Sequence, residues 1–235
     1  MKLDYNKGVD FFMEKYKQEF IQFMVKAGVL KFGEFITKSG RKTPYFINTG
    51  NYKTGEQVSK LGKFYAECIN HNLKDNEYIL FGPAYKGIPL VVTTAASLYS
   101  NFKKDVLFSF NRKERKDHGE GGNIVGHLPE DKENILIIED VVTAGTSVRE
   151  SVSLLKSIAD VNIFGLIISV DRMEKGSSGK STIQELEEEF GIKTYSIVTI
   201  EEVKKYLHNR EIDGKIIIDD GMKTKIEEYS LEYGV

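Results

Sequence analysis

The chain has 235 residues, 40% of them hydrophobic and 29% charged, which is typical of a soluble globular protein with one large domain. A formal net charge of −2 at pH 7 argues against a general nucleic-acid-binding protein. No apolar stretch reaches the roughly 20 residues of a membrane span, and the first residues lack the hydrophobic core of a signal peptide. The single cysteine excludes an internal disulfide and fits a reducing compartment, so we expect a cytoplasmic protein.

Helical and strand patterns alternate along most of the chain. Apolar side chains recur at helical spacing over residues 11–27, and Gly28 is suited to end that helix. Further helices are expected at residues 54–68, 88–99, 146–158, 181–190 and 199–207, with capping boxes at Thr54/Gln57, Ser181/Gln184 and Thr199/Glu202. Strands are expected at residues 44–48, 78–81, 106–110, 135–138, 161–170 and 194–198. This alternation predicts an α/β fold with a mostly parallel sheet flanked by helices.

Residues 111–126 interrupt this order. The segment is highly charged, contains four glycines and follows neither the helical nor the strand period. Long irregular stretches inside a compact domain are usually functional lids or disordered loops. We therefore expect a mobile loop here.

Residues 134–147 form the most informative motif, in which an aliphatic run ends in Glu139 and Asp140 and a Thr/Gly/Ser loop follows. Ser147 and Glu150 have the capping-box spacing that opens a helix. Backbone amides and the helix dipole at such a start hold phosphate, which leaves the two carboxylates for ribose hydroxyls or a hard cation. An ordinary turn with two exposed acids is the weaker alternative, because adjacent carboxylates repel each other and need a partner. The motif thus predicts a site for a phosphorylated sugar.

A second anion site is indicated by residues 81–89, where two glycines bracket a turn after a strand. Lys86 precedes the next helix and would add a positive charge there, although a solvated lysine on a simple turn is the alternative. In the glycine-containing loop, Arg112, Lys113, Arg115, Lys116 and His118 suit a polyanion such as diphosphate. Interleaved acids and missing aromatics weaken a nucleic-acid patch, while a solvated charged face stays open.

Two further segments suggest how a flat anionic ring would be bound. Residues 37–48 bring a basic turn against an aromatic strand, in which Phe46 could stack on a ring and Lys38 could serve a phosphate. Arg172 follows a buried strand on the ligand edge of the sheet, where its fork of donors could grip a carboxylate. A structural pair with Asp171 is the alternative for Arg172.

These segments occur in the order and spacing of the orotate phosphoribosyltransferases, which the chain resembles over roughly residues 20–235. The resemblance implies one type I phosphoribosyltransferase domain over residues 1–235. It also implies a small hood from approximately residues 1–50 with C-terminal contributions, and a mobile loop at approximately residues 111–126. The motifs that carry it lie at residues 30–35, 38–42, 81–89, 110–114 and 116–122, besides the acidic motif at residues 134–147.

The resemblance assigns site residues position by position. Binding of 5-phosphoribosyl 1-diphosphate (PRPP) falls to Lys38, Tyr85, Lys86, Arg112, Lys113, Lys116, His118, Glu139, Asp140, Val141, Val142, Thr143, Ala144, Gly145, Thr146 and Ser147. Binding of orotate falls to Phe46, Ile47, Thr143 and Arg172, and catalysis to Lys116, His118 and Asp140. Family members often have a second aromatic residue where Ile47 stands. The family also implies a homodimer in which Lys113 reaches the neighbouring subunit's site.

The implied reaction joins orotate to the phosphoribosyl group of PRPP, giving orotidine 5′-monophosphate and diphosphate in pyrimidine (UMP) biosynthesis. Mg²⁺ would act mainly through PRPP and water, since it prefers oxygen ligands and keeps several waters. Orotate is already an anion, so positioning and neutralisation of the leaving diphosphate should dominate catalysis. PRPP and orotate are the expected partners, without nucleic acid or membrane. The rivals are a transferase for a purine or another pyrimidine, and a non-catalytic PRPP-sensing regulator that binds nucleic acid.

Overall fold

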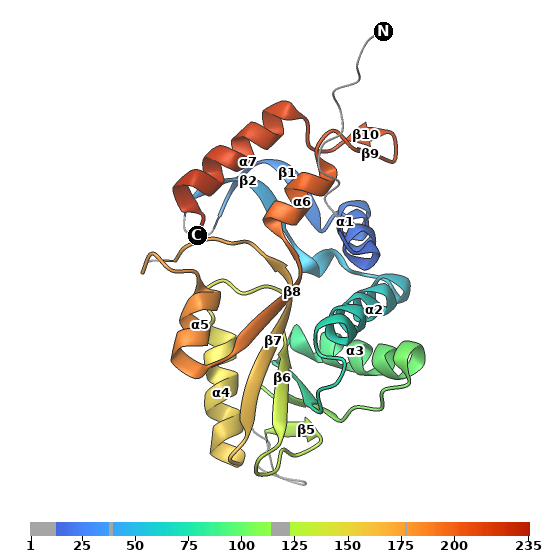
Figure 1. The fold of residues 1–235 in the computed structure, drawn as a ribbon, viewed down its shortest axis with the longest axis vertical. Coiled ribbons are helices and arrows are strands. Elements are labelled where there is room, and N and C mark those ends of the chain that lie inside the picture. Colours follow the sequence, from blue (N-terminus) through green and yellow to red (C-terminus); the bar gives the residue numbers. More distant parts are fainter. Residues whose placement is uncertain (1–12, 38–39, 114–122, 177) are drawn as a thin grey trace.

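A six-stranded sheet with strand order β5-β4-β3-β6-β7-β8 runs through the middle of the molecule (Figure 1). The computed structural model describes residues 13–37, 40–113, 123–176 and 178–235. The sheet strands are β3 (Ile79–Gly82), β4 (Phe108–Asn111), β5 (Ile124–Gly126), β6 (Asn134–Ile138), β7 (Asn162–Asp171) and β8 (Lys193–Thr199). All neighbouring strands are parallel except β4 and β5. The predicted α/β fold with a mostly parallel sheet is therefore confirmed.

Helices cover both faces of the sheet, with α2 and α3 on one side and α4 and α5 on the other (Figure 1). They span α2 (Gly55–Asn72), α3 (Gly87–Phe102), α4 (Thr146–Ile158) and α5 (Thr182–Phe190). Successive side chains of a strand point to opposite faces, and β6 shows the consequence. Leu136 and Ile138 join the hydrophobic cluster beneath α2 and α3, while Ile135 and Ile137 join the cluster beneath α4. A strand buried on both faces explains the continuous aliphatic run in the sequence.

A second layer lies above the sheet and forms the hood in Figure 1. Its antiparallel hairpin pairs β1 (Leu30–Ile36) with β2 (Lys42–Ile47), and helix α7 (Asp220–Tyr233) packs against β2. The remaining elements of this end are α1 (Lys15–Lys26), the short 3₁₀ helix η1 (Thr49–Asn51), α6 (Ile200–Leu207), β9 (Glu211–Ile212) and β10 (Lys215–Ile216). Segments from both ends of the chain thus cover the same edge of the sheet.

The chain order creates a crevice at that edge. After β3, the chain passes through α3 to β4 on one side, whereas β6 lies on the other side of β3. In open α/β sheets, ligands bind beyond the carboxyl ends of strands at such a switch point. The two acids at 139–140 and the glycine-bracketed turn at 82–87 follow β6 and β3 directly, so both predicted anion sites meet there.

The predicted N-terminal capping boxes of three helices are confirmed, and that of a fourth helix is wrong. Helices α2, α5 and α6 begin with the predicted capping boxes. Helix α4 begins where expected, but its N-cap is Gly145, at φ +71°, with no side-chain cap. Ser147 is therefore no capping residue; its hydroxyl serves Glu139 instead. The predicted irregular stretch is also too long, because Ile124–Gly126 pairs with β4 as β5. Across the described part of the chain, no helix is both long and apolar enough to cross a membrane.

Candidate functional site

Asp140 is the most densely bonded residue at the carboxyl end of β6. Its Oδ2 accepts hydrogen bonds from Lys86 Nζ at 2.7 Å and Thr49 Oγ1 at 2.6 Å, and Oδ1 accepts the Val141 amide at 2.8 Å. Only 6% of the residue is exposed. The carboxylate thus joins the sheet, the glycine-bracketed turn and η1, and a charged amine compensates its burial.

Glu139 lies beside Asp140 and is equally buried. Its Oε1 accepts the Ser147 hydroxyl at 2.5 Å, and Tyr65 donates to its backbone oxygen at 2.7 Å. Burial raises the pKa of Glu139, and the charge of Asp140 adds to the rise against the hydrogen bond from Ser147. Glu139 is thus bonded to the first turn of α4 rather than left open to solvent.

The loop of residues 141–147 connects these acids to the start of α4. Gly145 needs its positive φ, and an added Cβ would come within 2.8 Å of both Arg149 Nη1 and Thr182 Cγ2. Arg149 Nη1 donates to the Ala144 oxygen and Thr182 Oγ1 to the Thr143 oxygen, which pins the loop between α4 and α5. Because the first amides of a helix have no partner within the helix, this fixed loop presents an anion-binding end.

The glycine-bracketed turn brings two further predicted residues to the same crevice. The Lys86 side chain is 62% exposed although it pairs with Asp140. Tyr85 is 64% exposed, and Lys113 Nζ lies 4.9 Å from the centroid of its ring. Arg112 follows β4 and is held through its amide to the Asn123 oxygen at 2.7 Å. Lys86 and Lys113 thus bring positive charge to this side of the crevice, as a diphosphate requires.

A pocket of about 570 Å³ lies between the hood and the sheet edge, and we call it the hood pocket. It is lined by Phe46 from β2, Thr143 from the phosphate-type loop, and Arg172 and Glu174 after β7. Phe46 is 42% exposed, and its ring stacks on Phe35 with centroids 5.6 Å apart. A pocket lined by both an aromatic ring and a guanidinium suits a flat anion.

Arg172 forms its ion pair with a residue that the sequence did not indicate. Its Nε and Nη2 donate to Glu174 Oε1 at 3.1 and 2.7 Å, while its Cζ lies 5.3 Å from the Tyr45 ring centroid. Burial opposes the charged form of Arg172, but Tyr45 and Glu174 outweigh it and the pKa rises. The alternative of a pair with Asp171 is wrong, because Asp171 Oδ1 instead accepts the Met173 amide.

The other predicted residues divide into two groups. Ile47 is half-buried and packs against the core, on the strand face opposite Phe46, so it does not line the hood pocket. Lys38, Lys116 and His118 lie outside the described residues, as does most of the segment at 111–126 for which a mobile loop was predicted. Their predicted roles stay predictions.

Sequence reasoning missed Thr49, Arg41, Glu174 and Tyr229. Thr49 bonds to Asp140, Arg41 and Glu174 line the hood pocket, and Tyr229 donates to Glu174. Thr49 and Tyr229 come from segments without a recognisable motif. Arg41 belongs to the basic turn, and Glu174 follows Arg172 by two positions. The Arg-x-Glu spacing was the only local signal for the ion pair.

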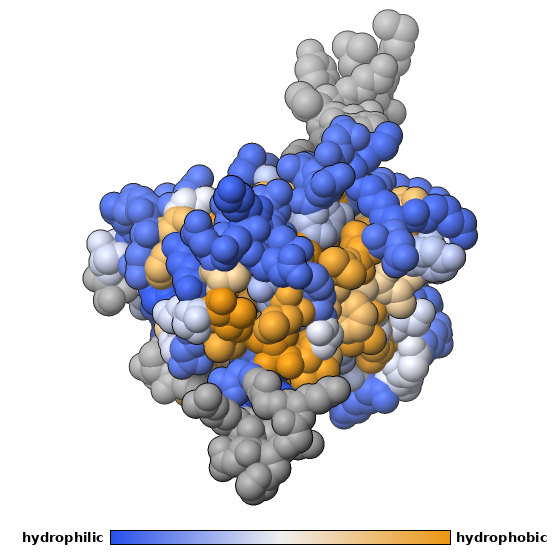
Figure 2. All heavy atoms as spheres, turned by 90° about the horizontal axis from the view of Figure 1, so that it is seen from below, coloured by the Kyte–Doolittle hydropathy of each residue, from blue (hydrophilic) through white to orange (hydrophobic). Residues whose placement is uncertain are grey.

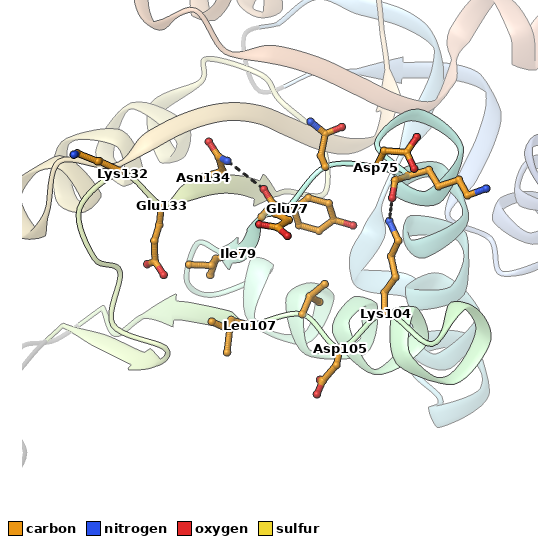
Figure 3. A pocket seen from close by; sticks show the side chains of 13 residues that line it. Asp75, Glu77, Ile79, Lys104, Asp105, Leu107, Lys132, Glu133 and Asn134 are labelled. Atoms are coloured by element: carbon orange, nitrogen blue, oxygen red, sulfur yellow. Dashed lines mark hydrogen bonds between the residues drawn. The ribbon is translucent and has the colours of Figure 1, made fainter.

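A separate hollow of about 660 Å³ lies at the opposite edge of the sheet, near the amino ends of β3, β4 and β6 (Figure 3). Charged side chains of both signs line it, among them Asp75, Glu77, Lys104, Lys132 and Glu133. Charges of both signs match no single ligand class. The candidate site is therefore the crevice and hood pocket at the carboxyl edge.

Comparisons with known proteins identify the family. A family model described as "Phosphoribosyl transferase domain" matches residues 48–196, more than half of the chain. Orotate phosphoribosyltransferase of Clostridium beijerinckii is 57% identical over 94% of this chain and 99% of that protein. The enzyme of the same name from Clostridium acetobutylicum is 58% identical over 95% of this chain and 100% of that protein.

Solved structures give the same result. Orotate phosphoribosyltransferase of Francisella tularensis superimposes with a TM-score of 0.80 at 37% identity, covering 92% of this chain and 96% of that one. A Mycobacterium tuberculosis orotate phosphoribosyltransferase in complex with PRPP has a TM-score of 0.57 at 14% identity, covering 80% and 98%. At that identity, the second likeness supports the fold alone.

Proposed function

This chain belongs to the orotate phosphoribosyltransferase family, and we propose that it transfers the 5-phosphoribosyl group of PRPP to orotate. The products are orotidine 5′-monophosphate and diphosphate, in pyrimidine biosynthesis. The observation that carries the proposal is that Arg172 and Phe46 line the same hood pocket as Thr143 of the phosphate-type loop. A guanidinium together with an aromatic side chain is complementary to a planar ring that bears a carboxylate.

PRPP would lie over the switch point between β3 and β6. The loop of residues 141–147 and the start of α4 would hold the 5-phosphate, because unpaired helix amides and the dipole attract anions. Asp140 would hold ribose hydroxyls, with Glu139 supporting the loop through Ser147. Lys86 Nζ donates to Asp140 Oδ2 at 2.7 Å. We propose that diphosphate draws Lys86 away and so frees the Asp140 oxygen for ribose.

Catalysis would rest on position and charge. Orotate is already an anion, so the pocket needs only to align its nitrogen with C1 of the ribose. Lys86, Arg112 and the loop residues Lys116 and His118 would neutralise the leaving diphosphate, and His118 would donate a proton to it. Asp140 would stabilise positive charge that develops on the ribose.

Mg²⁺ is proposed as a companion of PRPP. Among the described residues, no group of three or more His, Cys, Asp and Glu could hold a metal. The two acids present, Glu139 and Asp140, are occupied by Ser147, Thr49 and Lys86. This donor set fits an ion held mainly by diphosphate oxygens and water, which would supply charge neutralisation.

A homodimer is proposed from exposed apolar surface. Apolar side chains gather on the face shown in Figure 2. Val92 and Tyr99 on α3 are 39% and 57% exposed, and Leu107 and Leu128, next to β4 and β5, are 53% and 61% exposed. Contiguous apolar surface of this kind marks interaction sites. We propose that a second copy covers it and that Lys113, which contacts Tyr85 of its own chain here, reaches the partner's site.

The cytoplasm is the proposed location. It is supported by the single cysteine, Cys68, which is free and buried, as expected in a reducing compartment.

The proposal is tested by mixing the protein with PRPP and Mg²⁺ and offering orotate, uracil or hypoxanthine in turn. Loss of orotate absorbance, with much slower use of the other two bases, is expected. Turnover of hypoxanthine or uracil in preference to orotate would assign the chain to a rival transferase. Absence of turnover on all three, with PRPP still bound, would favour the regulator.

A further inference from the structure

Glu174 connects the hood pocket to the hood itself. Its Oε1 accepts hydrogen bonds from Tyr45 Oη at 2.7 Å and Tyr229 Oη at 2.9 Å, besides those from Arg172. Its Oε2 lies 3.4 Å from Arg41 Nη1. These partners come from β2, from α7, from the segment after β7, and from the β1–β2 turn. One carboxylate, 18% exposed, therefore joins four segments of the chain.

The contact with Arg172 is directional. A guanidinium has five N–H donors in a rigid fork, and Glu174 engages only the Nε–Nη2 edge through one oxygen. The Tyr45 ring lies 5.3 Å from Arg172 Cζ and limits the tilt of the plane. Nη1 and the second Nη2 proton remain outside the pairing with Glu174. Glu174 holds one edge of the guanidinium. It thereby determines which other edge, with two N–H donors, faces a ligand carboxylate.

Charge and burial make this arrangement sensitive to Glu174. Burial disfavours the charge of Arg172, whereas the face of the neutral Tyr45 ring and the Glu174 carboxylate favour it. Burial also raises the pKa of Tyr45, with Glu174 adding to the rise, so Tyr45 stays a neutral donor to the carboxylate. A buried network in which every group is satisfied is rigid, whereas one that lacks its central acceptor leaves donors unpaired.

Resting on the proposed function, we infer that Glu174 is a positioning residue for orotate. It fixes the guanidinium of Arg172 for the carboxylate of the substrate, and it links that orientation to helix α7 through Tyr229. Glu174 itself does not react. The alternative role for Glu174 is that of a competitor, in which its carboxylate occupies Arg172 until orotate displaces it. The two roles predict opposite changes in the KM for orotate.

The test is the variant Glu174→Gln, assayed with orotate and PRPP varied separately. The amide keeps the shape but loses the charge that orients Arg172, so the KM for orotate should rise about tenfold, the effect of about 1.4 kcal/mol. The KM for PRPP and kcat should change less than about twofold, which a general structural defect would not produce. An unchanged or lowered KM for orotate would overturn the inference.

Two further variants keep the test decisive. Tyr229→Phe removes only the hydroxyl that ties α7 to Glu174, so it should raise the KM for orotate by a smaller factor, even if Glu174→Gln fails to fold. An unchanged KM for orotate in Tyr229→Phe would refute the link to α7. Glu188→Gln, which breaks an exposed pair with Lys180, is the matched control and should leave both KM values unchanged. Failure of the wild type to use orotate would instead reject the proposed function.

Discussion

At the scale of single residues, this site places carboxylates where water reaches them poorly. Burial raises the pKa of Asp171, against the hydrogen bond that its Oδ1 accepts from the Met173 amide at 2.8 Å. Arg172 stands next in the chain but pairs with Glu174 instead. The ionised form of Asp171 is therefore disfavoured in the folded protein, and it lines the hood pocket.

A stability difference that depends on pH follows for Asp171→Asn. With a raised pKa, the folded state binds the proton more tightly than the unfolded state, so stability falls as pH rises from the unfolded value of about 3.9 through the folded one. Asparagine keeps the acceptor for Met173 without the charge. Urea unfolding should show the variant to be more stable than the wild type at pH 8, with the gain lost near pH 4. An equal gain at both pH values would contradict this explanation.

Residue roles were predictable where the chemistry is local. The acids at 139–140 follow a recognisable buried strand, and Arg172 follows another, so both could be placed at the ligand edge. Ser147 was misjudged because its spacing to Glu150 fits a capping box, whereas its partner Glu139 becomes a neighbour only through the turn at Gly145. Glu174 needed the hood in place, since Tyr45 and Tyr229 come from distant parts of the chain.

At the scale of elements, the close contact between α2 and α3 supports the sheet face that leads into the site. A Cβ added at Gly62 on α2 would lie 2.6 Å from the backbone carbonyl of Thr93 on α3. Such a distance requires the helices to move apart. Gly55, in the first turn of the same helix, has open space around the corresponding position.

Substitution of these two glycines by alanine should therefore have opposite effects. Gly62→Ala should lower the free energy of unfolding by about 1–3 kcal/mol, the usual cost of overpacking. Gly55→Ala should be neutral or stabilising by up to about 1 kcal/mol, because alanine restricts the unfolded chain. Denaturant unfolding of both variants checks the pair. Equal changes in the free energy of unfolding would mean that the close contact between α2 and α3 does not restrict the side chain at position 62.

Elements with strong local signals were predicted, and those that depend on tertiary contacts were missed. Capping boxes mark the starts of three helices within four residues, beginning at Thr54, Ser181 and Thr199. Strand β1 was missed because its register shifts between Phe32 and Phe35, around Gly33 at φ +152°, which breaks the alternation. Helix α7 buries only Ile226 and Tyr229, so its apolar stripe is too weak to read from the sequence.

At the scale of the whole molecule, the site lies where the hood meets the carboxyl edge of the sheet. Segments from both chain ends form that hood, with α7 against β2 (Figure 1). The proposed dimer would use a different surface, on α3 and beside β4 and β5. The proposed dimer surface would thus lie apart from the hood pocket, whereas Lys113 would connect assembly to the side of the site that holds PRPP.

Val92→Glu should disrupt the proposed dimer, because it places a charge in the apolar surface of α3, where Val92 is 39% exposed. Analytical ultracentrifugation should show a species of twice the chain mass for the wild type and a single chain for the variant. Leu231→Glu, on α7 at 85% exposure, is the control and should leave the mass unchanged. A wild type that sediments as one chain would reject the dimer.

The central claim is that Arg172 in the hood pocket selects a substrate that carries a carboxylate. The most direct measurement is the ratio of kcat/KM for orotate over uracil, in the wild type and in Arg172→Gln, with folding checked by thermal unfolding. Losing charge-assisted hydrogen bonds of about 1.5–3 kcal/mol should lower that ratio by about 10- to 100-fold, mainly through orotate. A folded variant that keeps the wild-type ratio would show that another group reads the carboxylate.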